Sequence, residues 1–425
     1  MSMNEQAGDP ASGTVSVSDD KAEAIVRRSC KRRQQKLSRL QALTKTNPRK
    51  AKSLSRRYFA SKSVRIAGAY DAWRRLAPKP LKDQVVPFAE IVEAGLALDM
   101  WNASEEPVFL RPKERHNHRK RYFPILDLRE KARDRIAYDV AKVLAELHPN
   151  QFMTRGPEHL NAWLEQHLPK GAMVITTDIP SCHDMIRRSS VMRDVPLPGH
   201  VLKAVLMDTK ERAVHLVKEP KGGSTVLVPS SGDHASPFVD AGPSCRGILT
   251  GAALAIYASE LVIKNILVAA ESAAPGVHAA AWGDNLIIIL EDASVAALVY
   301  AAVEYAVADN FGMDVLDGLA RRKQETLLPG VFHYCGQWHQ MKSGKLMRRV
   351  DANRSDAAMI KVGMMISDMK TKDDLEKIRR TITGYVISCR HDPKTLKEYL
   401  EEVISYGAAK VSEIAAALIA TEKIA

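Results

Sequence analysis

Two aspartates, each at the end of an apolar run, are the residues of this chain whose placement best suits catalysis. Asp284 lies in the turn Gly283-Asp284-Asn285 between two apolar runs, a pattern typical of a tight β-hairpin. Asp178 ends the apolar run 173–177. Gly, Asp and Asn are common in such turns for conformational reasons alone. The hairpin by itself therefore does not indicate a catalytic site, and a second acid from another part of the chain is needed. Two strand-end carboxylates brought together would bind divalent metal through oxygen and support phosphoryl transfer.

Length and cysteine usage restrict the class of protein. A chain of 425 residues can bury a sizeable core and is expected to form two or three subdomains. We expect no signal peptide, membrane-spanning segment or membrane partner, since charges interrupt the longest apolar runs. Five cysteines without metal-ligand spacing indicate reduced thiols and a cytoplasmic protein; they are Cys30, Cys182, Cys245, Cys335 and Cys389.

Positive charge is concentrated near the N-terminus. The net charge is +12, but residues 27–75 carry +16, with seventeen Lys and Arg against Asp71, and the rest of the chain carries about −4. This asymmetry favours a nucleic-acid partner, with a solvated helical face as the alternative. Arginines and aromatics are interleaved there in a way that would suit RNA, although the aromatics could equally pack in a core. The residues are Arg56, Arg57, Arg65, Arg74 and Arg75 with Tyr58, Phe59, Tyr70 and Trp73.

Two further segments are candidates for nucleotide binding. Residues 111–121 form a second basic run before a strand-like stretch, and cations there could clamp a triphosphate; these are Arg119, Lys120 and Arg121. Gly247 and Gly251 lie in a loop that leads into a small-residue helix. Missing side chains would let a nucleotide or a template base approach the backbone, and tight helix packing is the other explanation.

Periodicity predicts the remaining elements. We expect helices over 21–76 with a break at Pro48, and over 88–101, 134–147, 157–168 and 293–311. Strands are expected over 213–218 and 224–228, which should pair, and over 332–338 with a turn. Three or four helices follow from about residue 351, one with a methionine stripe typical of core.

The order of these motifs resembles the palm of template-dependent polymerases, in particular bacterial reverse transcriptases of the group II intron and retron-like kind. Asp178 with Asp184 resembles the D-x-x-x-F-F-D motif, Gly247 the Q-G-x-x-x-S loop and Asp284 the Y-A-D-D hairpin. Further along, Lys323 and Thr326 resemble the K-T motif, and Cys335-Gly336 the L-G of the primer grip. Upstream, Arg121 and Asp134-Arg135-Ile136 look like the fingers pattern that ends in D-R-I.

Three positions depart from the family pattern. Asn285 replaces the second hairpin aspartate, Arg246 replaces the glutamine before the loop glycine, and His183 replaces the aromatic residue that screens the 2′-hydroxyl. A Gly-Asp-Asn hairpin is similar to that of polymerases from nonsegmented negative-strand RNA viruses. An amide oxygen is still a metal ligand, though a weaker one than a carboxylate.

The resemblance implies an α+β right-hand polymerase with a small antiparallel palm sheet. Its parts would be a disordered tail at 1–20, a basic helical arm at 21–77, fingers at 78–172, a palm at 173–345 with an inserted hairpin at 201–241, and a helical thumb at 346–425. The implied reaction is two-metal nucleotidyl transfer with two Mg²⁺ ions, Mn²⁺ being the alternative. Implied partners are an RNA template and primer, nucleoside triphosphates and an associated structured RNA.

The resemblance also assigns roles to residues. The implied catalytic residues are Asp178, Asp284, Asn285 and Lys323, and the implied metal ligands are Asp178, Ile179, Asp284 and Asn285. Nucleotide contacts would come from Arg119, Lys120, Arg121, His183, Arg246 and Gly247. Nucleic-acid contacts would come from the five N-terminal arginines named above and from Cys335 and Gly336. RNA-directed DNA polymerase is the expected activity. One alternative is an RNA-directed RNA polymerase, favoured by His183 and the Gly-Asp-Asn hairpin, and the other is a non-catalytic RNA-binding protein, favoured by Asn285 and the basic arm.

Overall fold

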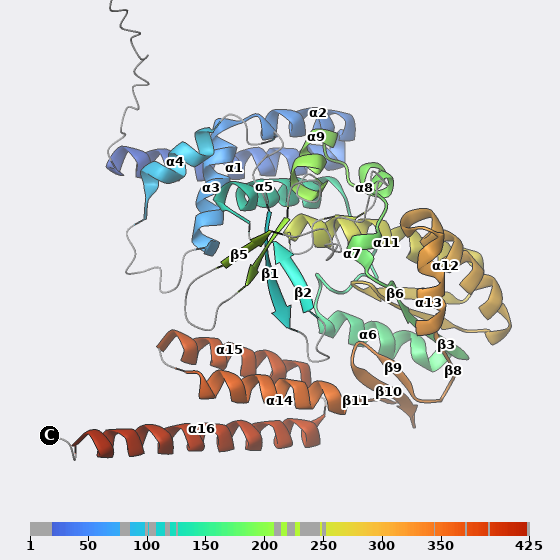
Figure 1. Cartoon of the computed structure of the whole chain (residues 1–425). Helices are drawn as coiled ribbons and strands as arrows, with labels where there is room; N and C mark the ends of the chain where they lie inside the picture. Colours follow the sequence, from blue (N-terminus) through green and yellow to red (C-terminus); the bar gives the residue numbers. More distant parts are fainter. Residues whose placement is uncertain are drawn as a thin grey trace, which may run out of the picture. The chain divides into compact units, whose positions relative to one another are not determined.

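Helices and small sheets make this chain an α+β protein, as the sequence predicts (Figure 1). The computed structural model describes residues 19–76, 86–97, 101, 108–114, 120–124, 126–207, 214–218, 226–229, 247–248, 252–343, 345–369, 372–389 and 392–422. The chain divides into two compact units, one of Met1–Trp101 with Leu126–Val143 and the other of Asn102–Ile125 with Leu144–Ala425. The expected tail at 1–20 lies almost wholly outside the described residues.

The first unit consists of helices. They are α1 (Asp19–Thr46), α2 (Pro48–Phe59), α3 (Lys62–Leu76), α4 (Phe88–Leu96) and α5 (Leu128–Leu144), whose last residue belongs to the second unit. The expected break at Pro48 is found, because Pro48 takes the first turn of α2 and the Asn47 side chain accepts a hydrogen bond from the Lys50 N–H at 3.0 Å. The helix expected over 88–101 was too long. It ends at Leu96, because Ala97 adopts a ψ of 117°, outside the helical region.

The core of the first unit uses residues expected to face RNA. Tyr58 and Phe59 are buried, so their stacking on RNA is excluded and the core interpretation holds for both. Arg65 is 5% exposed, and its guanidinium donates to the Ala97 carbonyl at 3.3 Å. The prediction that Arg65 contacts nucleic acid was therefore wrong. The alternation of basic and aromatic residues in the sequence does not determine which of these side chains become buried when the helices pack.

A four-stranded antiparallel sheet is the centre of the second unit. Its order is β6-β7-β3-β8, formed by β3 (Met173–Asp178), β6 (Val277–Trp282), β7 (Asn285–Leu290) and β8 (Gln324–Leu327). Every residue of β7 after Asn285 is buried, as expected for a central strand. The long helix α11 (Ala253–Ala273) packs against β6, and α12 (Ala296–Phe311) packs against α11.

Short elements connect the sheet to its surroundings. The helices are α6 (Pro157–His167), α7 (Cys182–Met185), α8 (Arg188–Asp194), α9 (Gly199–Leu202) and α13 (Leu316–Arg322). Single turns lie at η2 (Leu168–Lys170), η3 (Lys203–Met207), η4 (Ala293–Val295) and η5 (Met313–Val315). The helices expected over 157–168 and 293–311 are thus present, with a tighter turn at one end of each.

Two further sheets belong to the second unit. The first has the order β2-β1-β4-β5, formed by β1 (Val108–Glu114), β2 (Lys120–Pro124), β4 (Val214–Lys218) and β5 (Val226–Pro229). The expected pairing of 213–218 with 224–228 is found in β4 and β5, which are antiparallel. The second contains β9 (Phe332–Tyr334), β10 (Gln337–Lys342) and β11 (Lys345–Val350), in the order β11-β10-β9.

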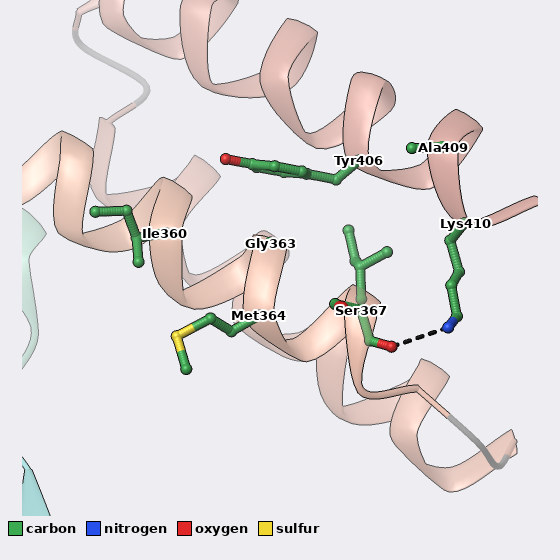
Figure 2. Close-up of a pocket in the computed structure, with 8 residues that line it drawn as sticks. Ile360, Gly363, Met364, Ser367, Tyr406, Ala409 and Lys410 are labelled. Atoms are coloured by element: carbon green, nitrogen blue, oxygen red, sulfur yellow. Dashed lines mark hydrogen bonds between the residues drawn. The ribbon is translucent and has the colours of Figure 1, made fainter. Parts of the chain in front are cut away.

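Three helices end the chain, in agreement with the expectation for the region after residue 351. They are α14 (Ala352–Ser367), α15 (Lys372–Cys389) and α16 (Pro393–Glu422), and α14 lies beside both of the others (Figure 1). The methionine stripe of α14 was expected to be core, which is confirmed for Met359, Met365, Ile366 and Met369, whereas Ile360 and Met364 are 56% and 62% exposed. They line a groove between α14 and α16 in which the Lys410 ammonium donates to the Ser367 carbonyl at 2.9 Å (Figure 2).

One helix among the described residues is long and apolar enough to cross a membrane. This is α11, whose mean hydropathy over the relevant stretch is 1.6 and of which 67% is buried inside the protein. Such burial is what the central helix of a folded core shows.

Candidate active site

The hairpin between β6 and β7 presents Asp284 at its tip. Trp282 and Asn285 are direct partners, so Gly283 and Asp284 form a two-residue loop. Gly283 has a φ of 61°, which a residue with a side chain rarely adopts and which a type II′ hairpin requires at this position. The backbone conformation of the turn therefore explains the glycine at position 283. It does not require an aspartate at position 284.

The aspartates from the two strand ends belong to backbone segments that meet at one edge of the sheet, although they are 106 positions apart. Asp178 is the direct cross-strand partner of Asn285 in the β3–β7 pairing, and residues so paired have Cβ atoms about 5 Å apart on one face. The Ile179 N–H donates to the Asp284 carbonyl at 3.0 Å, which continues the ladder into the loop. The structure thus brings the two acids to one edge of the sheet.

Electrostatics at Asp178 are dominated by burial and by one arginine. Burial raises the pKa of Asp178, the adjacent Arg322 guanidinium opposes that rise, and the charge of Asp284 adds to it. Arg322 forms an ion pair with the Asp178 carboxylate, with side-chain exposures of 43% and 32%. A cation therefore already occupies one side of the acid that the sequence singled out.

Helix α13 positions Arg322. The Thr177 hydroxyl donates to the Leu319 carbonyl at 2.9 Å, which ties α13 to β3 one residue before Asp178. A Cβ on Gly318 would lie 2.7 Å from Pro180 Cγ, so α13 can approach the chain after Asp178 this closely only because residue 318 has no side chain. Sequence reasoning missed Arg322, although the run Arg321-Arg322-Lys323 was a signal that could have found it.

Lys323, the predicted catalytic lysine, points elsewhere. Its ammonium forms an ion pair with Glu325 at 2.8 Å and lies 4.0 Å from the centroid of the Tyr300 ring. Burial and the carboxylates of Glu304 and Glu325 raise the pKa of Tyr300 to about 12. Lys323 is thus held by α12 and β8, while its neighbour Arg322 is the cation that contacts Asp178.

The glycine loop reaches the segment that follows Asp178. The Gly247 N–H donates to the Ile186 carbonyl at 2.7 Å, and the Ile248 N–H donates to the His183 carbonyl at 2.8 Å. Gly247 has a φ of 81°, and its carbonyl accepts from Arg188 Nε at 3.4 Å. The loop of Gly247 and Ile248 is therefore hydrogen-bonded to the segment 183–188, which contains His183 and Arg188.

A tyrosine from a neighbouring sheet forms a hydrogen bond with the backbone of the hairpin. Tyr334, on β9, donates from its hydroxyl to the Asn285 carbonyl at 3.0 Å. Burial raises the pKa of Tyr334 well above its usual range, so this hydroxyl remains a donor. Cys335 and Gly336 follow with φ values of 51° and 74° and form the turn into β10. The predicted strand and turn at 332–338 is therefore correct.

The remaining predicted site residues are scattered. Arg119 and Arg246 lie outside the described residues, and Lys120 and Arg121 belong to β2. Arg56, Arg57, Arg74 and Arg75 are exposed on the helices of the first unit. Within the described ranges, the predicted site residues brought together at the hairpin are Asp178, Ile179, Asp284 and Asn285. Gly247 is hydrogen-bonded to Ile186, in the segment that also holds His183.

The oxygen donors at the hairpin suit a hard divalent cation. The Asn285 amide nitrogen donates to the Asp284 carboxylate at 3.2 Å and to the Trp282 carbonyl at 3.3 Å, which leaves its amide oxygen as the ligand atom. Among the described residues, no three His, Cys, Asp or Glu side chains form a metal-binding group. The donor set of two carboxylates and one amide fits Mg²⁺ or Mn²⁺ when substrate phosphates complete it. Arg322 stands in for such a cation at Asp178.

Neither a protein-family model nor a curated protein matches this sequence. The function must therefore be argued from the residues of the hairpin and of its neighbouring strand.

Proposed function

We propose that this protein is a template-dependent nucleic-acid polymerase of right-hand architecture, with RNA-directed DNA synthesis as its reaction. The observation that carries the proposal is the direct pairing of the Asp178 strand end with the Gly-Asp-Asn hairpin, across 106 positions of sequence. In this architecture the hairpin sheet is the palm, helices α14, α15 and α16 are the thumb, and β1 and β2 belong to the fingers. Phosphoryl transfer with oxygen-ligated metals needs such a pair of acids.

The chain's own residues have definable roles in this reaction. Asp178 and Asp284 would hold two Mg²⁺ or Mn²⁺ ions, which supply activation of the attacking hydroxyl and charge neutralisation at the leaving pyrophosphate. Asn285 contributes its amide oxygen, and the Tyr334 hydroxyl fixes the backbone of Asn285. Arg322, which pairs with the Asp178 carboxylate, can turn to a triphosphate oxygen as a charge-assisted donor. Lys323 pairs with Glu325 and lies against the Tyr300 ring, so we assign it no contact with the pyrophosphate.

Two alternatives each have specific observations in their favour. An RNA-directed RNA polymerase is favoured by His183, since imidazole replaces the aromatic side chain that excludes the 2′-hydroxyl in the resembled family, and the His183 carbonyl accepts from the Ile248 N–H. A non-catalytic RNA-binding protein is favoured by Asn285 and by the ion pair of Arg322 with Asp178, which together reduce the negative charge available to metals. Within the part of the chain that the structure describes, Cys30, Cys182, Cys335 and Cys389 form no disulfide, which suits the cytoplasmic location we propose.

Primer extension separates these functions. Wild-type protein and the variants Asp178→Asn and Asp284→Asn are given a primed RNA template with deoxynucleotides or ribonucleotides in separate reactions. We expect extension with deoxynucleotides by wild type and none by either variant. Asp317→Asn, an exposed acid on α13, is the matched control and should extend normally. Extension with ribonucleotides alone would establish the second function. Inert wild type with intact RNA binding, at every Mg²⁺ and Mn²⁺ concentration, would reject both polymerases.

A further inference from the structure

The sheet of β9, β10 and β11 has one face turned inward and one turned outward. Buried and exposed residues alternate along β10 and β11, as a half-buried sheet requires. The inward residues include His339, which stacks on Phe332, and Arg348, which pairs with Glu165 at 3.7 Å. We call the opposite side the outward face. It consists of Trp338, Gln340 and Lys342 on β10 and of Lys345, Met347 and Arg349 on β11.

The charges of the outward face are all of one sign. Lys342, Lys345 and Arg349 are its charged residues, and the three strands contain neither Asp nor Glu. Lys342 and Lys345 are direct cross-strand partners next to the hairpin loop. Like charges directly opposite each other on neighbouring strands destabilise a hairpin, because their Cβ atoms are close. An anion bound across both lysines would remove that repulsion.

The same face has an exposed indole in line with these cations. Trp338 is 44% exposed, although a side chain of this size is usually well buried. Its cross-strand neighbours are Arg349 on one side and His333 on the other, with the His333 and Trp338 rings 4.9 Å apart in an edge-to-face arrangement. A flat aromatic surface with Arg349 beside it and two lysines further along the same strands suits unpaired bases and their phosphates.

We infer that the outward face binds single-stranded nucleic acid, with one base stacked on Trp338 and the backbone phosphates paired to Arg349, Lys342 and Lys345. Charge complementarity selects a polyanion, and the aromatic surface selects unpaired bases over a duplex, whose bases are already stacked. This site is separate from the carboxylates of the hairpin. The inference rests on the proposed function only for the biological role of the bound strand.

The test is a binding titration that uses fluorescence anisotropy. The probes are a labelled twelve-nucleotide uridine RNA, the thymidine DNA of the same length and a blunt RNA duplex. Trp338→Ala should weaken binding of the single strands about 5- to 150-fold and leave duplex binding unchanged, since stacking of one base is lost. Equal losses for RNA and DNA would mean that the face reads bases and phosphates only, and a larger loss for RNA would add the 2′-hydroxyl to its contacts.

Lys345→Glu gives the sharper result, because it should improve folding while it impairs binding. The variant replaces a repulsive pair with Lys342 by an attractive one, so its thermal midpoint should equal or exceed that of wild type. Its affinity for single strands should fall, and the slope of log K against log salt should flatten by about 0.7 or more. Lys394→Glu on α16 makes the same charge change at an exposed site and is the control.

Several outcomes would overturn the inference. Binding by Trp338→Ala and Lys345→Glu that equals binding by Lys394→Glu would show that the outward face takes no part. Sedimentation in which Trp338→Ala loses self-association, with unchanged RNA affinity, would assign the face to a second copy of the chain. Failure of the polymerase proposal is distinguishable: wild type that never extends a primer, yet binds single strands through Trp338 and Lys345, leaves this inference standing.

Discussion

Glu260 is a buried acid whose ionisation should cost this protein stability near neutral pH. It lies on α11 and is 1% exposed, and neither carboxylate oxygen has a hydrogen-bond partner among the described residues. Burial raises the pKa of Glu260 to about 7 from an ordinary value of 4.5. That difference corresponds to about 3 kcal/mol, since each tenfold change in proton affinity is worth about 1.4 kcal/mol.

The sign of the effect follows from proton binding. The folded state holds this proton more tightly than the unfolded chain does, so the penalty is absent below about pH 4.5, grows as the pH rises and is complete above about pH 7. Glu260→Gln keeps the shape and removes the ionisation. We expect it to raise the free energy of unfolding of the second unit by about 3 kcal/mol at pH 8 and by almost nothing at pH 4.5.

Urea titrations followed by circular dichroism at pH 4.5, 6 and 8 measure this difference. Glu271→Gln is the matched control on the same helix. Although burial opposes it, the hydrogen bond with His148, the Ala279 N–H and the Asn150 amide lower the pKa of Glu271. That variant should be less stable than wild type at pH 8, with a deficit that shrinks as the pH falls. A gain for Glu260→Gln that is absent at pH 8, or equal at pH 4.5 and pH 8, would refute the assignment of Glu260 as an ionised, unpaired buried acid.

Three further predictions concern the site and its partner. Arg322→Ala should bind Mn²⁺ about fivefold more tightly in an electron paramagnetic resonance titration, because an exposed ion pair worth about 1 kcal/mol no longer competes with the metal. The control Arg321→Ala should match wild type, and an unchanged affinity in Arg322→Ala would show that Arg322 does not belong to the site. Asn285→Asp should lower the Mg²⁺ concentration needed for half-maximal extension, because it adds a carboxylate to the metal site; a higher requirement would contradict this charge argument. Reversing both Arg56 and Arg57 to Glu should weaken RNA binding and flatten its salt slope by about 1.4, whereas unchanged values would make this helix face merely solvated.

Local sequence patterns were sufficient for most elements. The hairpin at Gly283 and Asp284 follows from two apolar runs around turn residues, and β3 follows from an apolar run that stops at Asp178. The break at Pro48 has an equally local cause, because proline cannot continue a helix from its preceding turn. These features depend on neighbours within a few residues, which a sequence displays directly.

The tertiary structure decided which of several similar side chains act together. Arg65 and Arg56 look alike in sequence, but only Arg65 is buried against α4, because helix packing selects one face. The same applies to Ile360 and Met364, whose apolar character predicted burial that the packing of α14 does not provide. The solvent exposure of a side chain depends on contacts between elements, so it does not follow from the residue type.

The strongest case is the pair Arg322 and Lys323. Both are basic and adjacent, and sequence reasoning chose the lysine. In the fold, α13 ends at Arg322 and the chain becomes extended at Lys323, with a ψ of 131°, so the two side chains leave in different directions. One reaches Asp178 and the other reaches Glu325 and Tyr300. The sequence by itself determined that two acids end two strands and that basic residues follow. The direction in which each basic side chain points depends on the residue at which α13 ends, and the long-range packing of α13 against β3 sets that residue.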